Sequence, residues 1–231
     1  MEKLKPYRVT KAGPVYRVND IKKINRKLFE SLEWPKDAPW LTIDFPPTAM
    51  TKGRIPKFGL PAAYNPIVNC YSVGKRIKLP AAAEAKSVSV RPAASIAENL
   101  RVYRAACGHY LKAWGKKLGP AFRRNAESYV DKYLPDNKAL IVFKNGVPCG
   151  LYSYLPYKSD SKNICNHVTW HNLFPGLSLA EKSAAKYQAA VWLKKTSKRP
   201  ISVSLDTFEK EYFDFFAGLG LRMFRLLVER R

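Results

Sequence analysis

Acidic residues are scarce in this chain. It has 18 Asp and Glu against 41 Lys and Arg, and the formal net charge is +23. An excess of this size is not expected of a protein whose partners are all neutral, and it indicates a polyanionic partner. Nucleic acid, an acidic membrane surface and a phosphate-rich cofactor or substrate all satisfy that requirement, and net charge alone does not choose among them.

Cysteine is equally sparse, and long apolar runs are absent. The four cysteines, Cys70, Cys107, Cys149 and Cys165, are far apart and form no CxxC pair. This spacing excludes a disulfide framework and the paired-cysteine zinc motifs, so we interpret them as reduced thiols of a cytoplasmic protein. No stretch approaches the ~20 apolar residues of a membrane helix. The first residues, MEKLKPYRVTKAG, lack the apolar core of a signal peptide.

Motifs that identify a function directly are also missing. The sequence has no Walker loop, no GxSxG or HExxH, no zinc finger and no RRM peptide. What it does have is 231 residues with 46% hydrophobic and 13% aromatic content. That composition predicts a globular protein with a sizeable core.

The first 85 residues differ in character from the rest. Prolines and aromatics are dense between Trp34 and Pro80, too frequent for long helices and too irregular for a regular sheet. We therefore predict an irregular N-terminal extension, residues 1–85, that packs on a main domain of residues 86–231. Within the extension, Asp20 is a candidate cap of a short helix, and Ile67 to Tyr71 is a candidate edge strand.

Sharper signals begin at Val88. Lys144-Asn145-Gly146-Val147 lies between two apolar runs, and Asn-Gly in that setting predicts a tight type I′ hairpin. Ser95 to Glu98 and Ser178 to Glu181 each read as a capping box that opens a helix. The remaining periodicities predict strands at 87–92, 139–143, 147–154, 164–171, 201–205 and 221–229, and helices at 95–118, 121–134, 178–195 and 208–217.

A family resemblance rests on these motifs and their order. VSVRPAASIAENL resembles the opening strand and helix of the GCN5-related N-acetyltransferase (GNAT) superfamily, and FFAGLGLRMFRL is similar to its closing motif. The resemblance covers Val88 to Arg231. It implies an α+β fold, the GNAT-like acyl-CoA N-acyltransferase fold, with a mixed, mostly antiparallel central sheet flanked by helices.

The resemblance also implies a cofactor site. Members of the superfamily bind the pyrophosphate of acyl-CoA on backbone amides at the start of the helix after the fourth strand, in a loop Gln/Arg-x-x-Gly-x-Gly/Ala. The matching window here is Leu173 to Ser178. Its glycine is Gly176 and its last residue is small, but the leading Gln or Arg is absent and Pro175 has no amide. The implied ligand is acetyl-CoA or another acyl-CoA, and the implied binding residues are Gly176, Leu177, Ser178 and Leu179.

Catalytic residues follow less directly. The tyrosine that many members use as general acid falls at Phe216, and the asparagine found upstream falls at Glu209. Phe216 has no proton to donate, so Tyr212, one turn earlier, is the candidate acid.

For a base we consider His167 and His171, which regular alternation would place on one face of their strand with Cys165. The alternative is that both histidines are polar strand residues bonded to their neighbours. Cys165, His167 and His171 lack zinc spacing and a fourth ligand, so we predict no metal.

Three hypotheses about function remain. In the first, an acyl group passes from acyl-CoA to an amine acceptor by direct attack, and a polyanionic or nucleic-acid-associated acceptor would fit the net charge. In the second, the fold is a non-catalytic nucleic-acid-binding or scaffolding module. In the third, an aminoacyl-tRNA is the donor. We favour the transferase, because non-catalytic versions are the smaller group among proteins of this fold.

Overall fold

The structure, a computed structural model of the chain, describes residues 6–10, 13–18, 27, 35, 38, 40–60, 64–72, 77–118, 138–158, 164–196 and 200–230. Its strands are β1 (Pro6–Thr10), β2 (Gly13–Val18), β3 (Trp40–Ala49), β4 (Tyr64–Ser72), β5 (Val88–Pro92), β6 (Lys138–Lys144), β7 (Val147–Lys158), β8 (Ile164–Leu173), β9 (Ile201–Asp206) and β10 (Leu221–Arg230). Its helices are α2 (Ile96–Trp114), α4 (Leu179–Thr196) and α5 (Lys210–Gly218).

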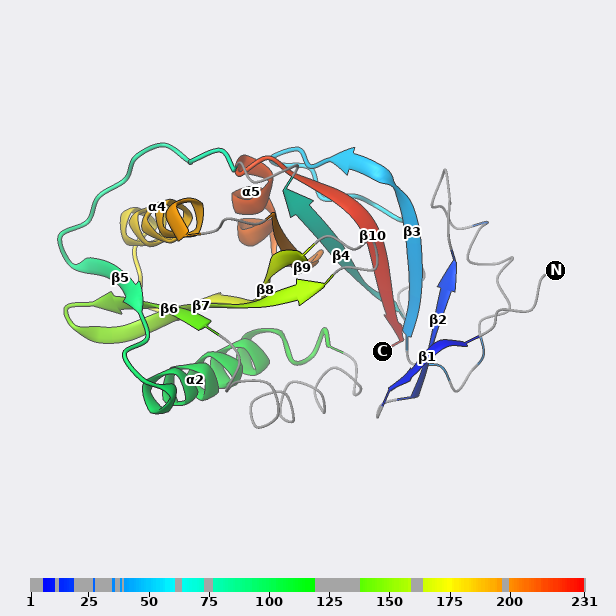
Figure 1. Cartoon of the computed structure of the whole chain (residues 1–231), viewed down its shortest axis with the longest axis horizontal. Helices are drawn as coiled ribbons and strands as arrows, with labels where there is room; N and C mark the ends of the chain where they lie inside the picture. Colours follow the sequence, from blue (N-terminus) through cyan, green and yellow to red (C-terminus); the bar gives the residue numbers. More distant parts are fainter. Residues whose placement is uncertain are drawn as a thin grey trace.

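Among the described residues, the strands form one mixed sheet in the order β1-β2-β3-β10-β4-β9-β8-β7-β6-β5. Figure 1 shows α2 on one side of this sheet, with α4 and α5 on the other. Each side has its own apolar core: Tyr103 and Cys107 of α2 belong to one cluster, and Ala189 of α4 and Phe213 of α5 belong to the other. In the described part of the chain, no helix is long and apolar enough to cross a membrane.

The β6–β7 hairpin is buried on both faces. Ile141 and Phe143 contact the α2 cluster, whereas Leu140 and Val142 contact the opposite one. A strand covered on both sides reads as a continuous apolar run, which explains the sequence ALIVF. At the turn, Asn145 and Gly146 have φ of 51° and 79°. These positive values confirm the predicted type I′ geometry.

Both predicted capping boxes are confirmed. Ser95 Oγ accepts from the Glu98 amide at 3.1 Å, and the Glu98 carboxylate accepts from the Ala94 amide at 2.7 Å. Hydrogen bonds from Arg91 and from that amide lower the pKa of Glu98 to about 2. Helix α2 ends at Trp114, earlier than the Gly119-Pro120 stop that we predicted. The predicted helices after Asp20 and over 121–134 lie outside the described residues.

The strand predicted near Ile67 to Tyr71 is confirmed, but its predicted place at a sheet edge is wrong. It is β4, and it lies between β10 and β9 with antiparallel pairing on both sides. The sequence from Ile67 to Ser72 contains no proline, so every amide there can join a ladder. Ile67, Val68 and Cys70 are all buried. The prolines in the rest of Trp34 to Pro80 led us to predict an irregular segment, although Ile67 to Ser72 is a short run suited to a central strand.

Because β4 is internal, we expect the chain to need it for folding. A fragment of residues 86–231 leaves β9 and β10 without their shared neighbour, and it should show no cooperative thermal transition by circular dichroism. A fragment of residues 38–231, which loses only β1 and β2 from the edge, is the control and should melt cooperatively. A cooperative transition of the shorter fragment at the full-length melting temperature would show that residues 86–231 fold alone.

Candidate functional site

Strands β8 and β9 are parallel neighbours that separate towards their ends. They pair over three positions, from Asn166 opposite Ile201 to Val168 opposite Val203. Beyond these, β8 continues to pair with β7 as far as Leu173, while β9 continues to pair with β4 as far as Asp206. The two strands therefore diverge at their carboxyl ends. In sheets with parallel strands, ligands bind preferentially at such ends.

His171 of β8 lies where the two strands have separated. Its ring is buried and packs edge-on against Tyr212 and Phe216 of α5, with centroid separations of 4.6 and 5.3 Å. Its Nε2 atom is 3.4 Å from a carboxylate oxygen of Glu209. Among the described residues, neither ring nitrogen has a hydrogen-bond partner. The three residues that correspond to, or replace, the family's catalytic positions therefore all surround one histidine.

His167 has a different setting. Its Nδ1 atom is 2.8 Å from Ser202 Oγ of β9. Burial, with a smaller contribution from His171, lowers its pKa to about 4, so the ring is neutral at physiological pH. A register shift between β7 and β8 interrupts the regular alternation on which the shared face was predicted. The side chain of Cys165 lies outside the described part. Within that part, no three His, Cys, Asp or Glu side chains gather as metal ligands.

Tyr212, the candidate acid, reaches the end of β8. Its hydroxyl oxygen accepts a hydrogen bond from the Leu173 amide at 2.6 Å. Burial, and after it the nearby Tyr152 and Glu209, raises the pKa of Tyr212 well above its usual value. The phenol therefore stays protonated. Because the amide uses a lone pair, the O–H remains available as a donor.

The predicted cofactor loop connects β8 to α4. Gly176 has a φ of 96°, which glycine adopts without strain, and a Cβ placed there would meet nothing within 4 Å. The Ser178 amide donates to the Glu181 carboxylate at 2.8 Å, so that predicted donor is already occupied. Leu179, in contrast, is 83% exposed.

Glu181 collects further donors at the same helix end. Lys144 Nζ lies 3.0 Å from its carboxylate, and Ser87 Oγ donates to it at 2.8 Å. The hydrogen bond from the Ser178 amide, followed by those from Lys144 and Ser87, lowers the pKa of Glu181 to about 2. The start of α4 therefore holds an ionised carboxylate, paired with the Lys144 ammonium.

Sequence reasoning missed a buried polar group beside this site. Asp206, the last residue of β9, accepts from Tyr110 of α2 at 2.5 Å and from Asn65 of β4 at 3.0 Å. Burial, and then the nearby charge of Glu209, raises its pKa from 3.8 to about 7. The available signal was an acidic residue at the end of the apolar strand ISVSL. Its two partners lie 96 and 141 positions away along the chain, so the pattern of neighbouring residues could not predict these contacts.

Comparison with known proteins bears on the fold. No protein-family model matches the sequence, and no curated protein is significantly similar to it. Among solved structures, a functionally unknown conserved protein from Staphylococcus epidermidis superposes with a TM-score of 0.53 at 13% identity, covering 96% of this chain and 87% of that one.

Two further structures are described as GCN5-related N-acetyltransferases. The one from Kribbella flavida has a TM-score of 0.45 at 13% identity and covers 89% of this chain and 72% of that one. The one from Sphaerobacter thermophilus has a TM-score of 0.42 at 12% identity, with 84% and 62% covered. The chain has a GNAT-like fold. The predicted α+β class and the predicted GNAT-like fold are confirmed, with β4 of the N-terminal segment built into the sheet.

The raised pKa of Asp206 has a consequence for stability. Between about pH 4 and pH 7 this carboxyl is protonated in the folded chain and ionised in the unfolded chain, so folding is favoured at low pH and loses that advantage as pH rises. Asp206→Asn removes the titration. The free energy of unfolding of the wild type, measured relative to this variant by urea denaturation, should fall by about 3 kcal/mol across that window. Parallel pH curves for the two proteins would contradict the assignment.

Proposed function

We propose that the protein is an N-acyltransferase that transfers an acyl group from acyl-CoA to an amine by direct attack. The observation that carries the proposal is the position of His171. It lies where β8 and β9 diverge, with Glu209 3.4 Å from its Nε2 atom and the ring of Tyr212 against it. A proton acceptor and a proton donor are thus side by side at the point where a GNAT-like fold admits its substrates.

The loop before α4 fits a phosphate-bearing donor in part. Among the described residues, the amides of Gly176, Leu177 and Leu179 donate to no protein acceptor. Unsatisfied amides at the positive end of a helix dipole favour an anion such as a pyrophosphate. Pro175 and Ser178 contribute nothing to such a site, and the carboxylate of Glu181 opposes it. When bound, acyl-CoA would supply the activated thioester.

His171 is the proposed base. An amine reaches the protein mainly as an ammonium ion, and it must lose a proton before its nitrogen can attack a carbonyl carbon. An imidazole without other hydrogen-bond partners can accept that proton, and Glu209 stabilises the resulting cation. His167 is a weaker base, because its pKa is lowered to about 4. Its bond to Ser202 supports a positioning role within the strand pair.

Tyr212 is the proposed acid. As the carbon–nitrogen bond forms, the carbon–sulfur bond breaks, and the departing thiolate needs a proton. The Tyr212 phenol retains its proton, and the Leu173 amide fixes its oxygen at the end of β8. In this scheme the ammonium ion gives one proton to His171 before attack, and His171 later releases it to water. The nitrogen loses a second proton as the carbon–sulfur bond breaks, and that proton restores Tyr212, which has protonated the thiolate. Together the two side chains perform the acid–base work that the fold requires.

His171→Ala should separate chemistry from cofactor binding. We expect isothermal titration to give the same dissociation constant for acetyl-CoA as the wild type, while thiol release with a panel of primary amines falls by about 100-fold or more. Lys138→Ala, which truncates an exposed side chain at the start of β6, is the control and should keep wild-type turnover. Absence of acetyl-CoA binding to the wild type at millimolar concentration would overturn the function, and undiminished turnover of His171→Ala would overturn the proposed base.

Glu181→Gln should strengthen donor binding. The substitution removes a negative charge from the start of α4 but keeps an oxygen that can accept from the Ser178 amide. Because a charge at a helix terminus has a modest effect on anion binding, we expect acetyl-CoA to bind roughly two- to fivefold more tightly by calorimetry. Glu98→Gln makes the same exchange in the capping box of α2 and should leave the affinity unchanged. Weaker binding to Glu181→Gln would mean that the donor phosphates lie elsewhere.

A further inference from the structure

Helix α2 has two sharply different sides. Its apolar side packs on β6 and β7 through buried residues that include Val102, Tyr103, Ala106 and Tyr110. Opposite this side lies a strip of exposed cations and small residues, with the exposed Ile96 and His109 at its margins. The strip consists of Ala97, Arg101, Arg104, Ala105, Gly108 and Lys112. Lys116 continues the row in the turn after the helix. We call Arg101, Arg104, Lys112 and Lys116 the α2 basic face.

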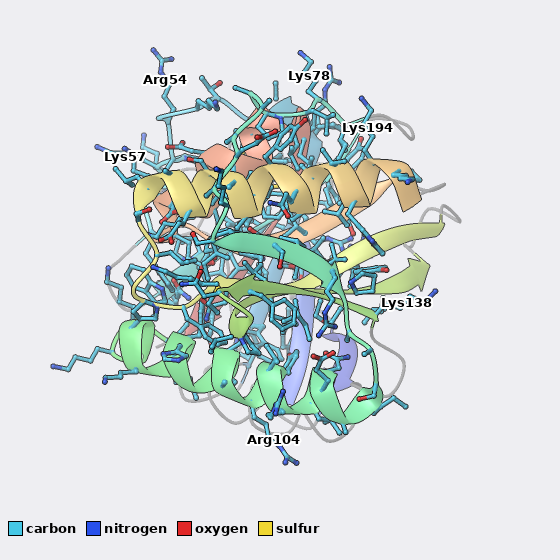
Figure 2. The ribbon with its side chains drawn as sticks, turned by 90° about the vertical axis from the view of Figure 1, so that its left-hand side faces the viewer. Arg54, Lys57, Lys78, Arg104, Lys138 and Lys194 are labelled. Carbon is cyan, nitrogen blue, oxygen red and sulfur yellow. The ribbon has the colours of Figure 1, made fainter. Side chains whose placement is uncertain are left out.

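The spacing of these residues makes one continuous surface. At 3.6 residues per turn, positions 97, 101, 104, 105, 108 and 112 fall within about a third of the helix circumference. Arg101 and Lys112 are about 16 Å apart along the helix axis, at 1.5 Å per residue. Figure 2 shows Arg104 extending from α2 away from the sheet. A Cβ built on Gly108 would meet nothing within 4 Å, so the middle of the face is open and flat.

Acidic residues are scarce along this helix. The sole acidic residue of α2 is Glu98 in its first turn, and that carboxylate is bound by Arg91 at 2.7 and 3.0 Å. From residue 99 to the end of α2 the sequence has no Asp or Glu. Lys117, just beyond, lies over the rings of Trp114 and Phe208 and is directed to another side.

We propose that the α2 basic face binds the phosphodiester backbone of double-stranded nucleic acid without sequence preference. Cations that replace condensed counterions supply most of the affinity in such binding. Small residues between the cations allow a backbone to approach closely. The face has no Asn or Gln to read base edges, and the exposed ring of His109 beside it packs on Phe174 with a centroid separation of 4.5 Å, which favours a duplex over a single strand.

An acidic membrane is the other polyanion that a basic helix can bind, and the structure disfavours it. A helix that lies in a bilayer surface presents an apolar side next to its basic one. The apolar side of α2 is buried against the sheet, and Ile96 in its first turn is the one large apolar residue of this helix that is exposed. A basic strip with a single exposed apolar residue at its start suits a hydrated phosphate backbone instead.

This inference is independent of acyl transfer. Tyr110, the residue of α2 that reaches Asp206, belongs to the buried side of the helix. Substitutions on the α2 basic face therefore leave the residues around His171 in place. Loss of duplex binding with intact acetyl-CoA binding, or the reverse, identifies which of the two proposals has failed.

The test is salt-dependent binding of the full chain to labelled 20-base-pair DNA and RNA duplexes of mixed sequence, measured by fluorescence anisotropy. Four phosphate contacts correspond to a slope of about −3.6 in a plot of log affinity against log salt concentration. The double substitution Arg101→Glu with Lys112→Glu should lower affinity by about tenfold or more at low salt and make the slope shallower by about 2. Arg101→Lys with Lys112→Arg keeps the charge and should retain binding.

A matched control separates this face from net charge. Lys194→Glu with Lys195→Glu makes the same change of charge at exposed positions of α4, and it should reduce duplex affinity only slightly. Thermal melts of each variant check that it is folded. Equal losses for the α2 and α4 variants, tighter binding to single strands than to duplexes, or binding to phosphatidylserine vesicles with none to duplexes would each overturn the proposal. DNA and RNA arms show which duplex is preferred.

Discussion

The hydrogen bonding of β9 to β4 is the constraint on which the site depends. A strand has two edges, and β9 uses one of them for β4 from Ser202 to Asp206. On its other edge it pairs with β8 over only three positions. Beyond Val203, β9 therefore stays in the sheet through its ladder to β4, and His171 lies on the part of β8 that no longer pairs with β9. A segment from the first third of the chain thus supports a site built by the last third.

The same ladder explains how a strongly basic protein accommodates buried acids. Asp206, Glu209 and Glu229 are all buried within a chain of net charge +23. Burial of a carboxylate is unfavourable unless it is protonated or hydrogen-bonded. Asp206 combines both means, since its pKa is raised to about 7 and it accepts from Tyr110 and Asn65. Asn65 is on β4, so the strand that pairs with β9 also stabilises the acid at the end of β9.

The sequence predicts features that depend on neighbouring residues well, and contacts between residues far apart in the chain poorly. The Asn145-Gly146 turn and both capping boxes follow from a few adjacent residues whose backbone preferences are strong, and all three were predicted correctly. The central place of β4 depends on pairing with strands more than a hundred residues away, which composition cannot indicate. The Asp206 group has the same difficulty, because its three members come from α2, β4 and β9. The register shift in β8 also escapes pattern reasoning, since alternation assumes an uninterrupted ladder.

The capping box Ser178 to Glu181 lies where the proposed function also requires an anion site, and these two roles conflict. The side chains of Ser178 and Glu181 accept hydrogen bonds from each other's backbone amides, which stabilises the first turn of α4. Glu181 also bonds Lys144 of β6 and Ser87, the residue before β5. The same carboxylate fills the positive end of the helix dipole, where an acyl-CoA pyrophosphate would otherwise bind. A helix start optimised for capping is thus a weaker anion site than one with a free glycine-rich loop. If this fold takes a phosphate-bearing donor, its affinity must come from fewer amides, and the rest of the donor has to supply more of the contact.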